Sequence, residues 1–284
     1  MLNLAVRNIK LYFRDKTSVF FSLLGVFVII GLYVLFLGDQ VEQSVGELPG
    51  ARFLMDSWIM GGVIAVTAIT TTMGAFGQMV DDKVKKNYKD IYASPLKRYK
   101  IAGGYLISSY IVGVIMSLLT FLLAELYIVL SGGELLPFNH IIKVIGIILI
   151  SVLASSAMIF FMVSLFKTNN SFATASTVVG TLMGFLMGIY IPIGVLPSSV
   201  QTFIKAFPLS HSGTLLRQIF MEVPISVTFK GIPLEEVEKF KSELGVVYKV
   251  GDEILTPSLQ IGFLLITAVV FYLLAILSIS RKNK

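Results

Sequence analysis

The stretch IIKVIGIILISVLASSAMIFFMVSLF, residues 141–166, decides the class of fold. It contains a single charged residue, Lys143, and is long enough to cross the roughly 30 Å apolar core of a bilayer as a helix. In lipid, a helix is the only open element that satisfies its own backbone hydrogen bonds. We therefore expect a membrane protein.

The composition of the whole chain of 284 residues has the same character. Hydrophobic residues make up 55% of it and charged residues 14%, whereas soluble globular chains carry about 25% charged residues. A soluble domain and a disordered chain are both excluded. With no cysteine and only His140 and His211, the sequence offers no disulfide framework, no Cys-ligated metal and no histidine-based catalytic pair.

Five more apolar stretches are long enough to span a membrane. The six predicted spans are residues 19–37, 58–80, 101–130, 141–166, 172–195 and 259–279. The first is too long for the apolar region of a signal peptide, and no small-residue cleavage site follows it, so we expect a retained helix. The predicted fold class is an all-α polytopic membrane protein with six transmembrane helices, forming one transmembrane domain over residues 1–284.

The charges predict the orientation of these spans. If the N-terminus is cytoplasmic, the inner segments hold 15 basic and four acidic residues, and the outer segments hold 8 basic and 12 acidic residues. An excess of Lys and Arg on the cytoplasmic side is the usual rule for membrane proteins. We expect a multi-pass protein of a bacterial plasma membrane with both termini in the cytoplasm. The basic residues then need no nucleic-acid partner.

Residues 1–17 alternate apolar and basic residues at roughly helical spacing. This pattern is typical of an amphipathic helix that lies in the inner interface, with its cationic residues near the headgroup phosphates. The alternative is a plain N-terminal extension of the first span. Membrane lipids are the expected partner in the first case.

The only long cytoplasmic loop is residues 81–100. A short helix there would carry one apolar-aromatic face, made of Tyr88, Ile91 and Tyr92. Ser94 and Pro95 would end that helix and start the next, since a residue before proline leaves the α region. The aromatic face would bind another protein or, alternatively, lie flat on the membrane.

The outer segments after the fifth span carry two patterns. In residues 196–222, Pro197 suits a helix start and Pro208 separates two short amphipathic helices, which predicts a re-entrant helical hairpin in the outer leaflet. Residues 223–257 predict a small external α/β insertion, with strands at 225–229 and 246–250 and a helix over 234–244 that ends at Gly245. We expect this insertion to handle substrate or a partner rather than to stabilise the spans.

Two features inside the predicted spans invite a functional interpretation. Glu125 is an ionisable residue in the outer half of the third span. It is either part of a transport pathway, or a structural group that is hydrated near the outer interface or paired with an outer base such as Arg217. Gly180, Gly184 and Gly188 recur every four residues in the fifth span, a spacing that lets a second helix approach closely. That helix would belong to the same subunit or to a second one.

No P-loop is present, because the chain contains no Gly-Lys dipeptide. The ordered combination of six spans, Ala93-Ser94-Pro95 in the cytoplasmic loop, Leu196-Pro197, Phe-Pro208-Leu and Leu-Leu-Arg217 resembles the membrane subunit of ABC-2 type transporters. The resemblance covers nearly the whole chain and is strongest over residues 190–220.

The resemblance implies the rest of a transport machine. The chain would be a permease rather than an enzyme and would hold no cofactor, while a separate cytosolic ABC ATPase subunit would bind ATP and Mg. It would pair with a second permease subunit, identical or paralogous. The family's coupling helix corresponds to residues 85–93, which places Tyr88, Ile91, Tyr92, Ser94 and Pro95 at the contact with the ATPase.

The same resemblance implies an outer gate and an activity. The re-entrant helices of the family correspond to the hairpin that holds Leu196, Pro197, Pro208 and Arg217. The activity would be export of a hydrophobic or amphipathic compound such as an antibiotic, lipid or peptide, as in multidrug resistance. A secondary transporter or a membrane scaffold without an ATPase is the alternative, and an adjacent ATPase reading frame would discriminate between them.

Overall fold

The computed structural model describes residues 1–33, 48–85, 89, 91, 98–251 and 253–281. The loop residues Tyr88, Tyr92, Ser94 and Pro95 lie outside this set. The described elements are α1 (Leu2–Arg14), α2 (Lys16–Leu32), α4 (Ala51–Val84), α6 (Arg98–Leu130), α7 (Phe138–Leu165), α8 (Asn169–Leu186), η2 (Ile193–Val195), α9 (Ser198–Ala206), α10 (Ser210–Phe220), α11 (Glu222–Thr228), α12 (Leu234–Glu243), β1 (Lys249–Val250), β2 (Glu253–Ile254) and α13 (Pro257–Arg281).

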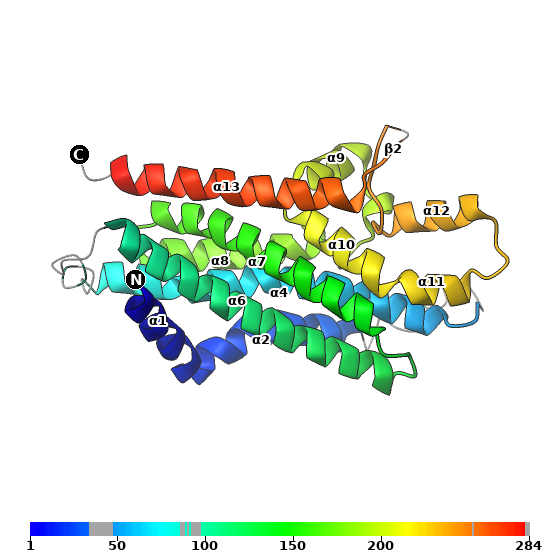
Figure 1. The fold of residues 1–284 in the computed structure, drawn as a ribbon, viewed down its shortest axis with the longest axis horizontal. Coiled ribbons are helices and arrows are strands. Elements are labelled where there is room, and N and C mark those ends of the chain that lie inside the picture. Colours follow the sequence, from blue (N-terminus) through cyan, green and yellow to red (C-terminus); the bar gives the residue numbers. More distant parts are fainter. Residues whose placement is uncertain (34–47, 86–88, 90, 92–97, 252, 282–284) are drawn as a thin grey trace.

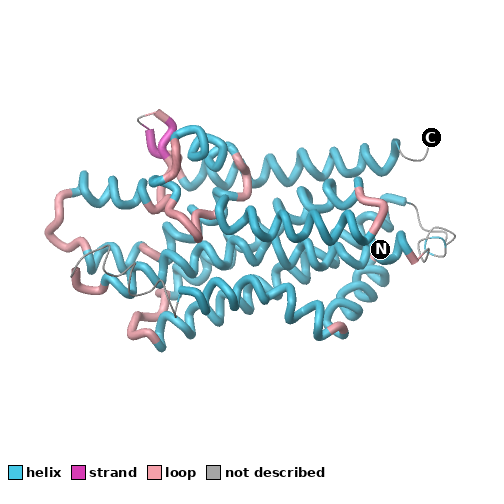
Figure 2. Tube along the Cα trace, turned by 180° about the vertical axis from the view of Figure 1, so that it is seen from behind, coloured by secondary structure: helices cyan, strands magenta, loops and turns pink. Residues whose placement is uncertain are grey.

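The long helices form an elongated bundle. Helices α4, α6, α7, α8 and α13 run along the long axis, and Figure 2 shows the same bundle from behind. Helix α1 and the C-terminal end of α13 lie at one end of the bundle, while α11 and α12 lie at the other, with α9 and the β1–β2 hairpin between (Figure 1). The N-terminal helix and the C-terminal end of α13 thus lie at the same end, which agrees with the prediction that both termini are on one side of the membrane.

Helix α4 is the centre of the bundle and contacts α2, α6, α7, α8 and α10. Its polar residues do not prevent this burial, because each threonine hydroxyl donates to the carbonyl one turn earlier. Thr67 bonds Val63 O at 2.8 Å, and Thr71 bonds Thr67 O at 2.7 Å. The threonine-rich face can therefore pack inside the bundle.

Four of the six predicted spans are confirmed as helices long and apolar enough to cross a bilayer. They are Ala51–Val84, Tyr99–Leu130, Phe138–Leu165 and Pro257–Ser278. Helix α1 and the segment Val19–Leu32 pass the same test only as a pair bent by 60°. The predicted first span continues to residue 37, beyond the described residues.

The fifth predicted span, residues 172–195, ends earlier than expected. Helix α8 stops at Leu186 because Gly188 has φ +64°. Gly188 N donates to Phe185 O and Ile189 N donates to Gly184 O, both at 2.9 Å, which is the hydrogen-bond pattern of a Schellman motif. One of the three regularly spaced glycines that suggested close helix packing, Gly188, therefore ends the helix.

The two short helices predicted after Pro197 are present as α9 and α10. Pro197 caps α9, and Phe207 is extended (φ −77°, ψ 115°) because it precedes Pro208. The pair is tied together across the turn: the Ser210 hydroxyl donates to Ile204 O at 2.7 Å. Helix α10 is buried against α4, α7 and α13, so it belongs to the core of the bundle.

The external insertion is more helical than predicted. Residues 225–229, predicted as a strand, belong mostly to helix α11, which packs on α4. No described strand lies beside this segment, and a lone strand would leave its backbone groups unpaired, whereas a helix pairs them internally. The predicted strand at 246–250 is reduced to Lys249–Val250, which pairs antiparallel with Glu253–Ile254.

The predicted helix of the insertion is confirmed as α12. It ends in a Schellman motif at Gly245, which has φ +66°. Gly245 N donates to Ser242 O at 3.2 Å, and Val246 N donates to Lys241 O at 2.8 Å. This turn directs the following residues back onto the bundle.

Candidate functional site

Arg217 is buried where α10 packs on α4. Its side chain is the largest among those that are fully buried. Its Nε donates to Trp58 O at 3.2 Å, and its guanidinium carbon lies 4.9 Å from the centre of a Trp58 ring. A cation over an aromatic face is stabilised by the ring quadrupole. Arg217 and Trp58 therefore join α10 to α4.

Two glycines of α4 make this close approach possible. A Cβ at Gly61 would lie 3.0 Å from Arg217 N, and a Cβ at Gly62 would lie 2.7 Å from Arg217 Nη2. The Cβ at Gly61 would press on the backbone of α10. The one at Gly62 would push against the side chains of Arg217 and Ile189. Arg217 Nη2 has no hydrogen-bond acceptor among the described residues, so the guanidinium is only partly compensated.

The chain that follows α12, residues 244–248, is packed over this junction. Three side chains of α4 and α10 donate hydrogen bonds to its carbonyl groups: Trp58 Nε1 to Leu244 (2.8 Å), Thr214 Oγ1 to Gly245 (3.2 Å) and Gln218 Nε2 to Val246 (2.9 Å). Val246 and Tyr248 are almost fully buried. These contacts tie the insertion to α4 and α10, so we expect it to contribute to stability, while the predicted role in handling substrate or a partner stays a prediction.

Glu125 lies in α6 and is 7% exposed. Its Oε2 accepts a hydrogen bond from Leu136 N at 3.0 Å, so the carboxylate fixes the loop between α6 and α7. No ion pair joins Glu125 to Arg217, whose partner is Trp58. Glu125 Oε1 has no hydrogen-bond partner in the described part of the chain.

The three glycines of the fifth predicted span have three different surroundings. Nothing lies within 4 Å of a Cβ built at Gly180, whereas Gly184 is covered by the ring of Tyr190 and Gly188 makes the turn after α8. Leu196 and Pro197 follow in the short link between η2 and α9. Of these three glycines, only Gly180 leaves room for another helix.

A buried polar network occupies the opposite end of the bundle. Asp82 is fully buried and accepts two hydrogen bonds from Arg7, at 2.8 and 2.9 Å. Tyr105 Oη donates to Asp82 Oδ2 at 2.7 Å, and Gln78 Nε2 donates to Oδ1 at 3.0 Å. One carboxylate thereby joins α1, α4 and α6 close to the end of α4.

Replacing Asp82 by Ala is expected to lower the free energy of unfolding by about 2 kcal/mol, because Arg7 and Tyr105 lose their acceptor. Removing one partner of a buried pair costs about 3–5 kcal/mol, but the Arg7 side chain is 37% exposed and solvent screens part of the loss. Thermal unfolding of the purified chain checks this, with Asp81→Ala as control, since Asp81 pairs with exposed Lys85. Equal shifts in both variants would contradict the assigned network.

The loop expected to transmit force begins beside this network. Of its predicted aromatic face only Ile91 is described, and it is half-buried against the apolar core of the bundle. The base of the loop is anchored to α7 and α8: Lys83 Nζ donates to Val163 O at 3.3 Å and Asn169 Nδ2 donates to Asp81 Oδ1 at 3.0 Å. The Asp81 carboxylate also raises the pKa of Lys85 through a hydrogen bond and its charge.

Sequence reasoning missed two buried carboxylates, Asp82 and Asp56. Both were counted as charges of polar segments, although Asp56 is 1% exposed and its Oδ1 accepts from Tyr127 Oη at 3.4 Å. The spacing of Gln78 and Asp82, one turn apart, is the one local signal.

Within the described ranges, no group of three or more His, Asp or Glu could hold a metal ion.

Comparison with known proteins identifies the class. A sequence model described as ABC-2 family transporter protein matches residues 51–277, so the chain belongs to the ABC-2 transporter family, as a permease and not an ATPase. Nodulation protein J of Bradyrhizobium diazoefficiens is 28% identical to it over 191 residues, which cover 66% of this chain and 69% of that protein.

Proposed function

We propose that this chain is the membrane-spanning subunit of an ATP-driven exporter, with six transmembrane segments and its termini in the cytoplasm. Separate cytosolic ATPase subunits bind ATP and Mg, and their movement reaches the permease through residues 81–100. The observation that carries the proposal is the family match over residues 51–277 of a bundle whose described part has four helices long and apolar enough to cross a membrane. At the end that holds α1, Arg7 and Asp82 tie this helix to α4.

Charge supports the orientation. The end that holds α1 and the start of the cytoplasmic loop carries Arg7, Lys10 and Arg14, whereas α11 and α12 together carry two lysines and five glutamates. This distribution follows the positive-inside rule. The bundle end with α1 therefore faces the cytoplasm of a bacterial cell.

Cysteine labelling checks this topology, and the chain contains no native cysteine to interfere. Lys239→Cys in α12 is expected to react with an impermeant thiol reagent in intact cells, because it is exposed at the outer end. Lys85→Cys is expected to react only after the cells are permeabilised. Labelling of Lys85→Cys in intact cells would reverse the orientation.

Helix α8 supports pairing with a second permease subunit. Only Met183 and Gly184 of this helix are buried, and Val178, Leu182 and Phe185 form an exposed face. Thr177 and Thr181 are also exposed, and α8 is not apolar enough to count among the candidate spans. A helix of this polarity fits a protein surface better than lipid, so α8 would face the second subunit, identical or paralogous.

The exported compound would be hydrophobic or amphipathic, as the resemblance to ABC-2 exporters implies. The function is tested by expressing the chain with the ATPase encoded next to it and measuring ATP-dependent export from inverted membrane vesicles. Export that requires hydrolysis supports the proposal. Export driven by an ion gradient without an ATPase would favour a secondary transporter instead, and an absence of any transport would favour a scaffold.

A further inference from the structure

Helix α1 presents three distinct faces. Leu4, Ala5, Asn8 and Tyr12 are buried against the bundle. Leu2, Val6 and Phe13 are apolar yet exposed, by 67%, 47% and 37%. The remaining face is polar and basic, because Asn3, Arg7, Lys10 and Arg14 follow one another at steps of three or four residues.

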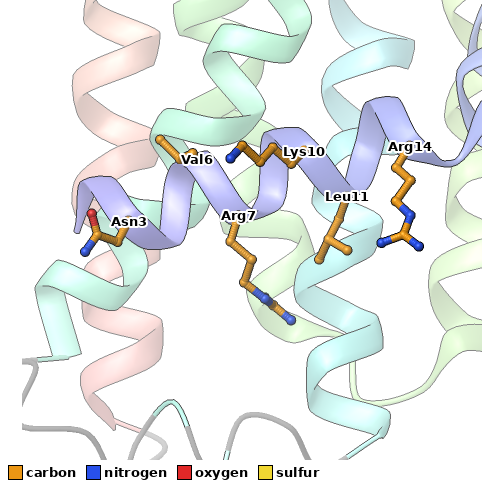
Figure 3. A pocket seen from close by; sticks show the side chains of 6 residues that line it. All are labelled: Asn3, Val6, Arg7, Lys10, Leu11 and Arg14. Atoms are coloured by element: carbon orange, nitrogen blue, oxygen red, sulfur yellow. The ribbon is translucent and has the colours of Figure 1, made fainter.

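The basic face borders a shallow pocket of about 380 Å³. Its lining is Asn3, Val6, Arg7, Lys10, Leu11 and Arg14 (Figure 3). Figure 3 shows Arg7 and Arg14 extending from the same side of the helix, with Lys10 lying along its surface towards Val6. The pocket therefore combines cationic groups with the edge of the exposed apolar face.

The three cations of this pocket are not equivalent. Arg7 is held by Asp82, with both guanidinium nitrogens within 2.9 Å of its carboxylate oxygens. In the described part of the chain, Lys10 and Arg14 have no ion pair, and both are exposed. Two cations are thus available to an external anion, while the third is already engaged.

We propose that this face of α1 is a binding site for the phosphate of an anionic phospholipid in the inner leaflet. Lys10 and Arg14 bind the headgroup, and the acyl chains lie against Leu2, Val6 and Phe13. An amphipathic helix with adjacent basic and apolar exposed faces lies in the plane of the membrane interface. The 60° bend between α1 and Val19–Leu32 turns the helix away from the direction of the second helix.

This choice of occupant follows from the apolar face. A free phosphate would bind the cations but leave Leu2 and Val6 in water. An acidic protein surface would bind the cations without needing the apolar side chains beside them. A lipid satisfies both faces at once. Because Arg7 in the same pocket is tied to Asp82, the bound headgroup also stabilises the position of α1 beside the cytoplasmic loop.

The test uses the full chain in phosphatidylcholine nanodiscs with or without phosphatidylglycerol. Phosphatidylglycerol bound to the purified protein is measured by native mass spectrometry. Lys10→Gln with Arg14→Gln is expected to lower its apparent affinity about fivefold for each charge removed, since each basic residue near an anionic surface contributes on that scale. Lys10→Arg with Arg14→Lys keeps both charges and is expected to retain binding.

The matched control is Lys143→Gln with Lys230→Gln, which removes two exposed charges elsewhere and is expected to leave binding unchanged. An equal loss in the control, or no loss in the α1 variant, overturns the proposal. Displacement of the lipid by soluble glycerol phosphate at equal affinity would indicate a free-phosphate site. Loss of ATPase binding with unchanged lipid binding would indicate a protein dock, and either result contradicts the lipid site.

Discussion

Replacing residues 226–254 by a short Gly/Ser linker is expected to prevent accumulation of folded protein in the membrane. The replacement removes the carbonyl acceptors of Trp58, Thr214 and Gln218. A buried donor left without an acceptor costs about 1–3 kcal/mol. It also removes Val246 and Tyr248, which are buried. The free energy of unfolding would therefore decrease several times more than it does for a typical single substitution.

The measurement is the amount of monodisperse protein extracted from the membrane. The matched control replaces only residues 250–253 at the β1–β2 turn, which leaves residues 244–248 and their three hydrogen bonds in place. We expect normal accumulation of the control. If the long replacement accumulates normally and loses only export, the insertion has no structural role and the original expectation stands.

Arg217→Ala is the substitution with the second largest expected effect. It removes the largest fully buried side chain, its hydrogen bond to Trp58 O and its contact with the indole ring. Truncating a large buried side chain to alanine typically costs about 3 kcal/mol, because a cavity remains. At about 2–4 °C per kcal/mol for a chain of this size, the melting temperature in detergent should fall by roughly 6–12 °C.

Arg217→Met distinguishes the effect of the cavity from the effect of removing the charge. A methionine fills most of the space and removes a guanidinium whose Nη2 has no acceptor among the described residues. Replacing a buried charge by an apolar side chain of similar volume is often neutral for stability. We expect the methionine variant to melt near the wild-type temperature, and equal destabilisation by both changes would show that the charge itself stabilises the packing of α10 on α4.

The long apolar helices could be predicted from the sequence because the bilayer imposes the length and composition of each. The helix break at Pro208 and the glycine end of α12 were equally readable, since proline and glycine act through local geometry. The end of α8 at Gly188 was missed because the apolar run continues beyond it, and hydropathy does not register one left-handed residue.

The partners of buried charges could not be predicted in the same way. Arg7 and Asp82 are 75 positions apart, and only the packing of α1 beside α6 and α4 brings them together. Trp58 and Leu244 are separated by 186 positions. Glu125 is a further example: its isolation in an apolar span suggested transport or pairing with Arg217, and the partner that the structure shows is the backbone of a nearby loop.

The most direct test of a permease driven through its cytoplasmic loop is the double substitution Tyr88→Ala with Ile91→Ala. Buried aromatic and aliphatic anchors dominate many interfaces, and truncation of one costs about 2 kcal/mol or more. The variant should still insert in the membrane but lose co-purification with the ATPase and ATP-dependent export, while Lys89→Ala, an exposed neighbour, should keep both. A double variant that retains the ATPase and exports at the wild-type rate would contradict the account.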